Sequence, residues 1–419
     1  MLRAAAALAV TLFAALVGPA APPAAGYTAK VPVGGPTRLD WTFVASNQSL
    51  ADPPAKLAGA DYDSKKQSYD LFLPDRKDPK KPIPAIVWVS ASDNAAGWHL
   101  FEKLCKDKGI AYIGVRDAGN DVPPPKRVRI VLDCLDDVRR QVPLDADRTY
   151  IGGFSGGARI ACAVAFALPE YFGGVIPVCA GGSMRDEPWL RHRVIDRLSA
   201  ALVTGTDDFN RGEVERWKGT MWKDFGIRTR VWVEKDSGHT MPPAATFADI
   251  LKWLDEDAPR RASAAKRSPA SRATPEGALT REENAKAVFD EAKQLLGAKA
   301  TMHRGLMLLK GASARWPDLA TGKAALKLLQ EYDAKKERPW EDDDIAEQRK
   351  QIAAEARGLG DYALNGIPAG SQYEKQKPDI AKRALDLWGV LIADAPDSLL
   401  GKEGKKLVAE LEPLTRKKK

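Results

Sequence analysis

The sequence is poor in the residues that build metal, redox and disulfide-stabilised sites. Its 419 residues include only four cysteines and four histidines. No two cysteines stand in a C-x-x-C spacing, which argues against a zinc ribbon or a dithiol redox centre. All four cysteines precede residue 180. Cys134 and Cys162 fall on two predicted helices that we expect on the same face of the molecule. They are a candidate disulfide pair in an oxidising compartment, with buried free thiols as an equal alternative.

The charge balance is also unremarkable, with 64 basic residues against 56 acidic ones and a formal net charge of +8. Much of the excess lies in residues 260–272 and 416–419, and neither stretch contains an aromatic residue. Nucleic-acid surfaces combine basic patches with recognisable binding motifs and aromatic side chains. The sequence therefore predicts no nucleic-acid partner. It also contains no nucleotide-binding loop and no cluster of metal ligands, so we expect neither a cofactor nor a metal.

Long apolar runs are confined to the N-terminus. Met1-Leu2-Arg3 is followed by an apolar run from Ala4 to Val17 and then by small residues and prolines up to Gly26. This order is typical of a signal peptide over residues 1–26, and the run is short for a membrane span. We therefore expect export to the periplasm, the envelope or the medium, with a retained N-terminal anchor as the alternative.

Residues 27–257 alternate strand and helix patterns, which predicts a mostly parallel eight-stranded sheet with helices on both faces. The strands are expected at Thr37–Ala45, Gln67–Leu73, Pro84–Val89, Ile110–Val115, Arg148–Gly152, Gly174–Val178, Ala200–Thr204 and Thr229–Val233. The helices are expected at Ala95–Lys106, Lys126–Gln141, Gly156–Leu168, Gly212–Phe225 and Thr246–Leu254. The stretch between the sixth and seventh strands is short, so no large cap is expected and the pocket should be open.

One stretch carries the candidate chemistry: Gly153-Phe154-Ser155-Gly156-Gly157 fits G-x-S-x-G between a predicted strand and a predicted helix. A serine on such a turn is held in a strained conformation with its oxygen above the sheet. It needs a base and an orienting carboxylate to become a nucleophile. His239 follows the last strand in Gly238-His239-Thr240, and Asp207-Asp208 follow the strand before it. The order Ser, Asp, His is that of an α/β-hydrolase.

These motifs, with Leu168-Pro169-Glu170-Tyr171-Phe172, resemble the α/β-hydrolase superfamily, and above all secreted feruloyl esterases and polyhydroxybutyrate depolymerase-like esterases. The resemblance covers about Ser68 to Leu254. It implies a serine esterase without a cofactor, and it selects Asp208 as the orienting acid, with Asp207 as the adjacent alternative.

The resemblance also implies an oxyanion hole, made by the backbone N–H groups of Ser92 and Gly156. In the esterases that the chain resembles, the strand before the first helix ends in His-Gly. This sequence has Ser90-Ala91 at that place. A backbone donor survives a change of side chain. Asp93, however, would oppose an oxyanion if its carboxylate faced inward.

Beyond the hydrolase region, residues 258–280 are basic and rich in proline, serine and alanine, which predicts a disordered linker. Residues 281–419 are expected to form an all-α domain with an internal repeat at an offset of 79 residues. Arg304-Gly305-Leu306 matches Arg383-Ala384-Leu385, and Trp316-Pro317-Asp318 matches Ala395-Pro396-Asp397. Each copy resembles a tetratricopeptide-type pair of helices. Because the offset of 79 residues is long enough for two such pairs, four helices are expected per unit.

The sequence thus predicts an exported serine hydrolase in which Ser155, His239 and Asp208 cleave carboxylic esters through an acyl-enzyme. Its substrate is an ester, and an open pocket suits bulky or polymer-attached acyl groups. The helical region is expected to dock a protein partner, or merely to stabilise the enzyme. The alternatives are a catalytically weak or inactive hydrolase-fold scaffold and a prolyl-oligopeptidase-like peptidase.

Overall fold

The computed structural model describes residues 24–46, 62–182, 187–218, 226–275, 280–334, 341–371 and 373–415. The predicted signal peptide lies almost wholly outside these residues. Eight strands form one sheet: β1 (Gly26–Pro32), β2 (Ser68–Leu73), β3 (Ile83–Val89), β4 (Ala111–Val115), β5 (Leu144–Phe154), β6 (Gly174–Val178), β7 (Ser199–Gly205) and β8 (Arg228–Glu234). No described helix is both long and apolar enough to span a membrane.

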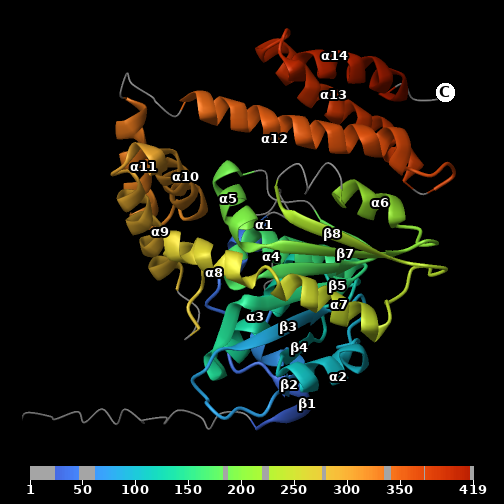
Figure 1. The fold of residues 1–419 in the computed structure, drawn as a ribbon, viewed down its shortest axis with the longest axis vertical. Helices are drawn as coiled ribbons and strands as arrows, with labels where there is room; N and C mark the ends of the chain where they lie inside the picture. The colour runs from blue at the N-terminus through green and yellow to red at the C-terminus, as the bar shows by residue number, and fades with distance from the viewer. Residues whose placement is uncertain are drawn as a thin grey trace, which may run out of the picture.

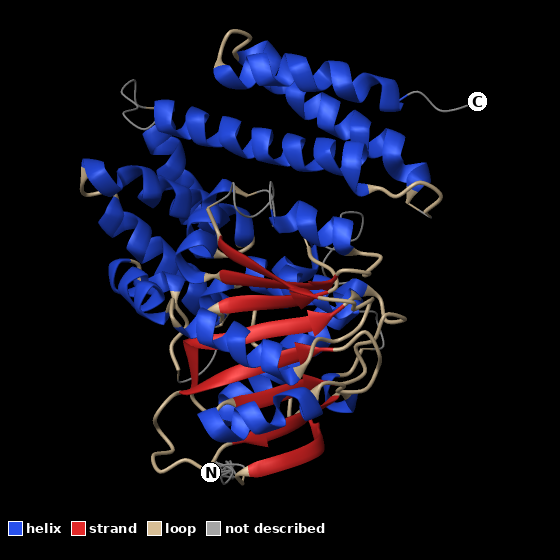
Figure 2. Cartoon of the chain, turned by 45° about the vertical axis from the view of Figure 1, so that its right-hand side comes forward, coloured by secondary structure: helices blue, strands red, loops and turns tan. Residues whose placement is uncertain are grey.

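The strands lie in the order β1-β2-β4-β3-β5-β6-β7-β8. Figure 2 shows them as one sheet, in red, with helices around it. β2 runs antiparallel to both of its neighbours, and every other pair in the sheet is parallel. This is the α/β-hydrolase fold that the sequence predicts. Because parallel strands end at the same edge, the loops after β3, β5, β6, β7 and β8 meet there.

Helices cover both faces of the sheet, and each face has its own apolar core (Figure 1). One core includes residues of α1 (Trp41–Ser46), α3 (Pro124–Gln141), α4 (Gly156–Ala167) and α5 (Pro188–Arg197). The other core includes residues of α2 (Trp98–Lys108) and α7 (Ala244–Asp255). Cys134 and Cys162 share the first core, as expected, but all four cysteines are buried and unbonded, so the candidate disulfide is wrong.

The first predicted strand, Thr37–Ala45, is also wrong. Phe43, Val44 and Ala45 are consecutive and all buried. The structure instead has helix α1 over these residues, and this helix packs against α3 and α4. The edge strand is instead β1, whose mostly exposed residues lack the alternation that signals a strand.

The remaining described helices lie toward the C-terminus, apart from the short α6 (Arg211–Arg216). They are α8 (Ala258–Arg267), α9 (Arg281–Leu295), α10 (Lys299–Arg315), α11 (Ala320–Asp333), α12 (Glu341–Asp361), α13 (Lys377–Asp394) and α14 (Leu399–Leu411). Short 3-10 or π turns lie at Ser64–Lys66, Pro169–Tyr171, Pro269–Ser271, Tyr362–Gly366 (η6), Glu374–Gln376 and Glu412–Thr415.

The 79-residue offset relates two helical pairs, α10–α11 and α13–α14. A Cβ on Gly322 would overlap the carbonyl oxygen of Trp316, and a Cβ on Gly401 would overlap that of Ala395. Both glycines therefore allow the same close approach of a helix to the preceding turn. Between the start of α10 and the start of α13 the structure describes three helices rather than the expected four, because the single long α12 lies where a second pair was expected.

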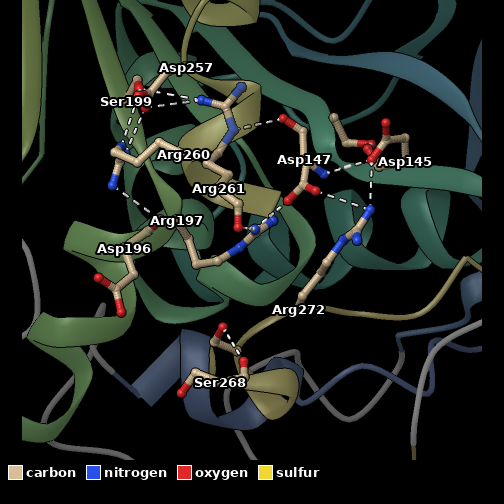
Figure 3. A network of polar contacts seen from close by, with 12 residues as sticks. Asp145, Asp147, Asp196, Arg197, Ser199, Asp257, Arg260, Arg261, Ser268 and Arg272 are labelled. Carbon is tan, nitrogen blue, oxygen red and sulfur yellow. Dashed lines mark hydrogen bonds and ion pairs between the residues drawn. The ribbon is translucent and has the colours of Figure 1, made fainter. Parts of the chain in front are cut away.

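The predicted disordered linker is largely ordered instead. Residues 258–267 form α8, and the Arg261 side chain is completely buried in the network of Figure 3. Its guanidinium donates to the carbonyls of Asp147 at 2.9 Å and Leu254 at 2.8 Å, and it pairs with Asp257 at 3.3 Å. A prediction from composition assumes that arginine is solvent-exposed. Here carboxylate and carbonyl oxygens at the end of the sheet accept the hydrogen bonds of the buried guanidinium.

The first C-terminal helices pack directly against the hydrolase region. Met307 of α10 belongs to the first core, and the ring of Trp189 on α5 fills the space beside Gly311. Arg315, at the end of α10, is completely buried between Asp40 at 3.1 Å and Glu170 at 3.3 Å. Buried charges in these pairs tie the two regions together, so the division at residues 257 and 281 remains a prediction about folding units.

Candidate active site

Ser155 lies on the turn between β5 and α4, with φ 54° and ψ −118°. Such a conformation is strained for a residue with a side chain and is the mark of a nucleophile elbow. The Ser155 N–H donates to the Val178 carbonyl at 2.8 Å, which fixes the turn to β6. A Cβ on Gly157 would overlap the carbonyl oxygen of Val89, and one on Gly153 would meet the backbone of Gly157. These contacts explain why the motif needs both glycines.

His239 and Asp208 meet at the same edge of the sheet. The Nδ1 atom of His239 lies 2.8 Å from Oδ1 of Asp208, whose side chain is completely buried. Asp208 also accepts the hydroxyl of Thr204 at 2.8 Å and the N–H of Asn210 at 2.9 Å. Asp207 is exposed, and its backbone N–H donates to Ser237. The geometry thus pairs His239 with Asp208 rather than with Asp207.

Two aromatic residues hold the imidazole. Phe209 stacks on His239 with ring centroids 4.0 Å apart, and Phe154 lies 5.0 Å from it on another side. Phe154 directly precedes Ser155, so the histidine ring adjoins the nucleophile turn. Among the described residues, Ser155 Oγ makes no hydrogen bond. Sequence reasoning missed both phenylalanines, although each is adjacent to a predicted site residue.

Cys179 adds a third polar group to this cluster. Its sulfur and ligand atoms of Asp208 and His239 all lie within 4.8 Å of one another, as metal ligands would. Burial first, and then the charge of Asp208, raises the pKa of Cys179 well above its usual range, so the thiol is protonated beside the carboxylate. Both oxygens of Asp208 are already hydrogen-bonded. The contact between Asp208 and His239 is therefore that of a hydrogen-bonded acid–base pair.

The two predicted oxyanion donors differ in whether their N–H groups already make a hydrogen bond. Gly156 is the first residue of α4, where the helix makes no use of the backbone N–H. The Ser92 N–H donates to the Ser90 hydroxyl at 3.1 Å. The substitution of Ser90 for histidine thus supplies an acceptor that occupies the Ser92 donor in this conformation.

Asp93 does not face the site. Its carboxylate accepts the Gly119 N–H at 2.9 Å, and its carbonyl accepts the Asp117 N–H at 2.7 Å. The loop after β3 is therefore tied to the loop after β4. This contact removes the electrostatic conflict that the sequence raises for an oxyanion.

Arg127 of α3, which sequence reasoning missed, holds the same two loops. Its buried guanidinium donates to the carbonyls of Ala118 at 2.7 Å and Ser90 at 3.2 Å, and to Oδ1 of Asn120 at 3.2 Å. Burial lowers its pKa to about 10, so it remains charged at neutral pH. The Asn120 side chain lies against the backbone of Gly156, where a Cβ would overlap it. Arg127 therefore positions both walls around the nucleophile turn.

Replacing Arg127 with methionine should leave two buried carbonyls unsatisfied and release both loops. We expect a loss of about 2 kcal/mol of unfolding free energy and a fall of roughly tenfold or more in kcat, because loop misplacement is costly. Urea unfolding and steady-state ester hydrolysis measure the two effects. Arg129→Met, on the same helix, removes a pair with Asp133 and should spare kcat. Equal kcat in both variants would contradict the positioning role.

The chain is similar to known proteins only at the level of solved structures. No protein-family model and no curated protein matches the chain. Solved structures to which it is similar include a thermostable esterase, with 18% identity and a TM-score of 0.35 over 45% of this chain. The chain spans 59% of that esterase.

Two other similar structures are covered more completely. One is an S-formylglutathione hydrolase from Staphylococcus aureus, with 14% identity and a TM-score of 0.35, and the match covers 46% of this chain and 90% of that one. The other is a Bacillus cereus carboxylesterase, with 15% identity and a TM-score of 0.34, and the match covers 46% of this chain and 94% of that one. At these scores the fold assignment depends on the sheet order, and the candidate site depends on its own geometry.

Proposed function

We propose that the protein is a serine hydrolase that cleaves carboxylic esters through an acyl-enzyme. Ser155 is the nucleophile, His239 the general base and Asp208 the acid that orients it. The observation that carries the proposal is the 2.8 Å contact between His239 Nδ1 and a completely buried Asp208, beside a strained serine turn. The fold alone supports many chemistries, so this contact is the specific support.

The chemistry follows from which nitrogen of His239 is engaged. Asp208 holds the Nδ1 proton and leaves Nε2 to accept the proton of Ser155 as its oxygen attacks the ester carbonyl. The free Ser155 hydroxyl tightens toward the imidazole when substrate binds, as catalytic hydrogen bonds often do. The Gly156 N–H donates a hydrogen bond to the oxyanion. The Ser92 N–H becomes the second donor when it leaves the Ser90 hydroxyl and turns to the oxyanion. Collapse then expels the alcohol, and water releases the acid.

A second candidate is a catalytically weak or inactive scaffold on the same fold. It is favoured by the contact between the Ser92 N–H and the Ser90 hydroxyl. An oxyanion hole with one free donor would lose about 3 kcal/mol of transition-state stabilisation. Ser90→Gly separates the two candidates, because it frees the Ser92 donor. Hydrolysis that rises only in this variant would favour the weak scaffold.

Hydrolysis of 4-nitrophenyl butyrate tests the main proposal. The full chain should turn over the ester with a burst of 4-nitrophenol, because this good leaving group makes acylation faster than hydrolysis of the acyl-enzyme. Ser155→Ala should abolish the burst, while Ser313→Ala, a surface control on α10, should keep it. A burst that persists without the Ser155 hydroxyl would rule out the assigned nucleophile.

We also propose export and a docking role for the helical region. The charged start and short apolar run of residues 1–26 support export, and sequencing the N-terminus of the protein recovered outside the cytoplasm tests it. Exposed Leu326, Val390 and Leu399 on α11, α13 and α14 support a protein partner. Co-sedimentation with cell envelopes that survives replacement of all three by serine would contradict docking through these residues.

A further inference from the structure

A cavity of about 430 Å³ lies between the hydrolase region and the C-terminal helices. Arg159 of α4 with Glu213 and Arg216 of α6 line one wall. Tyr362, Tyr373 and Gln376, from the segment between α12 and α13, line the other. Figure 1 shows α6 beneath α12, and η6 contacts α6 directly. The cavity has the size of a pocket for a small organic molecule.

The hydrolase wall of this cavity is built from segments that leave the candidate active site. Arg159 is one helical turn beyond Ser155, about 6 Å along the axis, and its N–H contacts the Ser155 carbonyl at 3.4 Å. Gly181 and Gly182 follow Cys179, and α6 begins three residues after Asp208. Ser155, Asp208 and His239 are not among the described residues that line the cavity. The cavity is therefore connected to the candidate active site through these shared segments, and it is a separate pocket.

Among the described residues that line the cavity, two arginines and one glutamate leave one positive charge in excess. Arg159 and Glu213 form a two-point pair at 2.6 and 3.2 Å and neutralise each other. Arg216 lies under the ring of Tyr362 at 3.9 Å, and its buried Nε has no hydrogen-bond partner. Within the described residues, Arg216 forms no ion pair. Arg216 is half-buried, and a partly desolvated guanidinium gains from an anion, which a carboxylate provides with two parallel hydrogen bonds.

We propose that this cavity binds a carboxylate carried on a ring, and that Arg216 is its main contact. The proposal goes beyond the proposed function, because no residue of the candidate triad is among the described residues that line this cavity. Tyr362, Tyr373 and Gln376 supply flat apolar faces and hydroxyl and amide groups that suit either an aromatic ring or a sugar ring. The helical region would accordingly contribute one wall of a ligand site.

Binding can be measured without turnover by titrating the full-length Ser155→Ala variant in a calorimeter. The probes are benzoate with benzamide as its neutral control, and D-glucuronate with D-glucose as its neutral control. At least one carboxylate should bind to saturation while its neutral counterpart does not. The carboxylate that binds identifies the ring as aromatic or sugar. Failure of both carboxylates to saturate would overturn the proposal.

Three variants in the same background locate the contact. Arg216→Gln should weaken binding by roughly tenfold or more, because it removes a charge-assisted pair. Glu213→Gln should tighten binding several-fold, because it frees Arg159. Arg148→Gln, at the other end of β5, should change nothing. An unchanged affinity in Arg216→Gln would overturn the assignment. If that variant does not fold, unchanged or weaker binding in Glu213→Gln would do so.

The two proposals can fail separately. Carboxylate binding in a chain that never hydrolyses esters would refute the proposed function and leave the cavity assignment intact. Ester hydrolysis without carboxylate binding would refute the cavity assignment and leave the proposed function intact.

Discussion

Asp208→Asn is expected to lower kcat for ester hydrolysis by about a thousandfold or more, as loss of the carboxylate does in serine triads generally. Asparagine is nearly the same size, but it cannot stabilise the imidazolium that forms when His239 takes the serine proton. The direct contact of Asp208 with His239 Nδ1, and its complete burial, make this the group whose charge matters most. Steady-state kinetics with an aryl ester measures the loss.

Asp207→Asn is the matched control. Asp207 is exposed, and its backbone N–H rather than its carboxylate makes the contact with Ser237. This variant should keep most of the activity. The reverse pattern would move the role to Asp207, and full activity in both variants would mean that His239 needs no carboxylate from this turn.

Arg315→Met is expected to lower the free energy of unfolding by about 3 kcal/mol or more, because it breaks buried ion pairs from one side. Asp40 and Glu170 would then lose a cation in a site that excludes water. Burial raises the pKa of Glu170, but Arg193 and Arg315 outweigh it and hold the pKa below its usual range. Glu170 is therefore charged at neutral pH and needs these arginines. Urea unfolding followed by circular dichroism measures the effect.

Arg383→Met provides the comparison for a solvated pair. Arg383 of α13 contacts Glu355 at 2.6 Å, but its side chain is 68% exposed. Its loss should cost no more than about 1 kcal/mol. If Arg315→Met cost as little, the C-terminal helices would not be docked through buried charges, and the separate folding units expected from the sequence would be favoured again.

The parts of the fold that the sequence could predict are those with strong local patterns. Gly174–Val178 is a fully buried apolar run between helices, and the structure has β6 over the same residues. Trp41–Ser46 has the composition of a strand, yet tertiary packing of Phe43 and its neighbours makes it a helix. The basic segment 258–267 could not be recognised as ordered, because two of the oxygens that satisfy Arg261, those of Asp147 and Tyr150, come from residues over a hundred positions away.

The candidate site divides in the same way. Asp208 and His239 follow strand ends in a recognisable order, so their contact could be predicted, and Ser155 lies on the turn that its motif predicts. Arg127 could not, because an arginine within a helix gives no sign that three loop acceptors surround it. The engagement of Ser92 depends on the rotamer of Ser90, which no motif specifies.

The measurement that tests the central claim most directly is labelling of the purified protein with a fluorophosphonate, followed by peptide mass spectrometry to locate the adduct. A nucleophilic serine reacts with such a probe whatever ester it prefers, so the unknown substrate does not matter. The account predicts one adduct, on Ser155, that is lost in Ser155→Ala and strongly slowed in Asp208→Asn. An unlabelled wild-type chain, or an adduct that persists in Ser155→Ala, would contradict it.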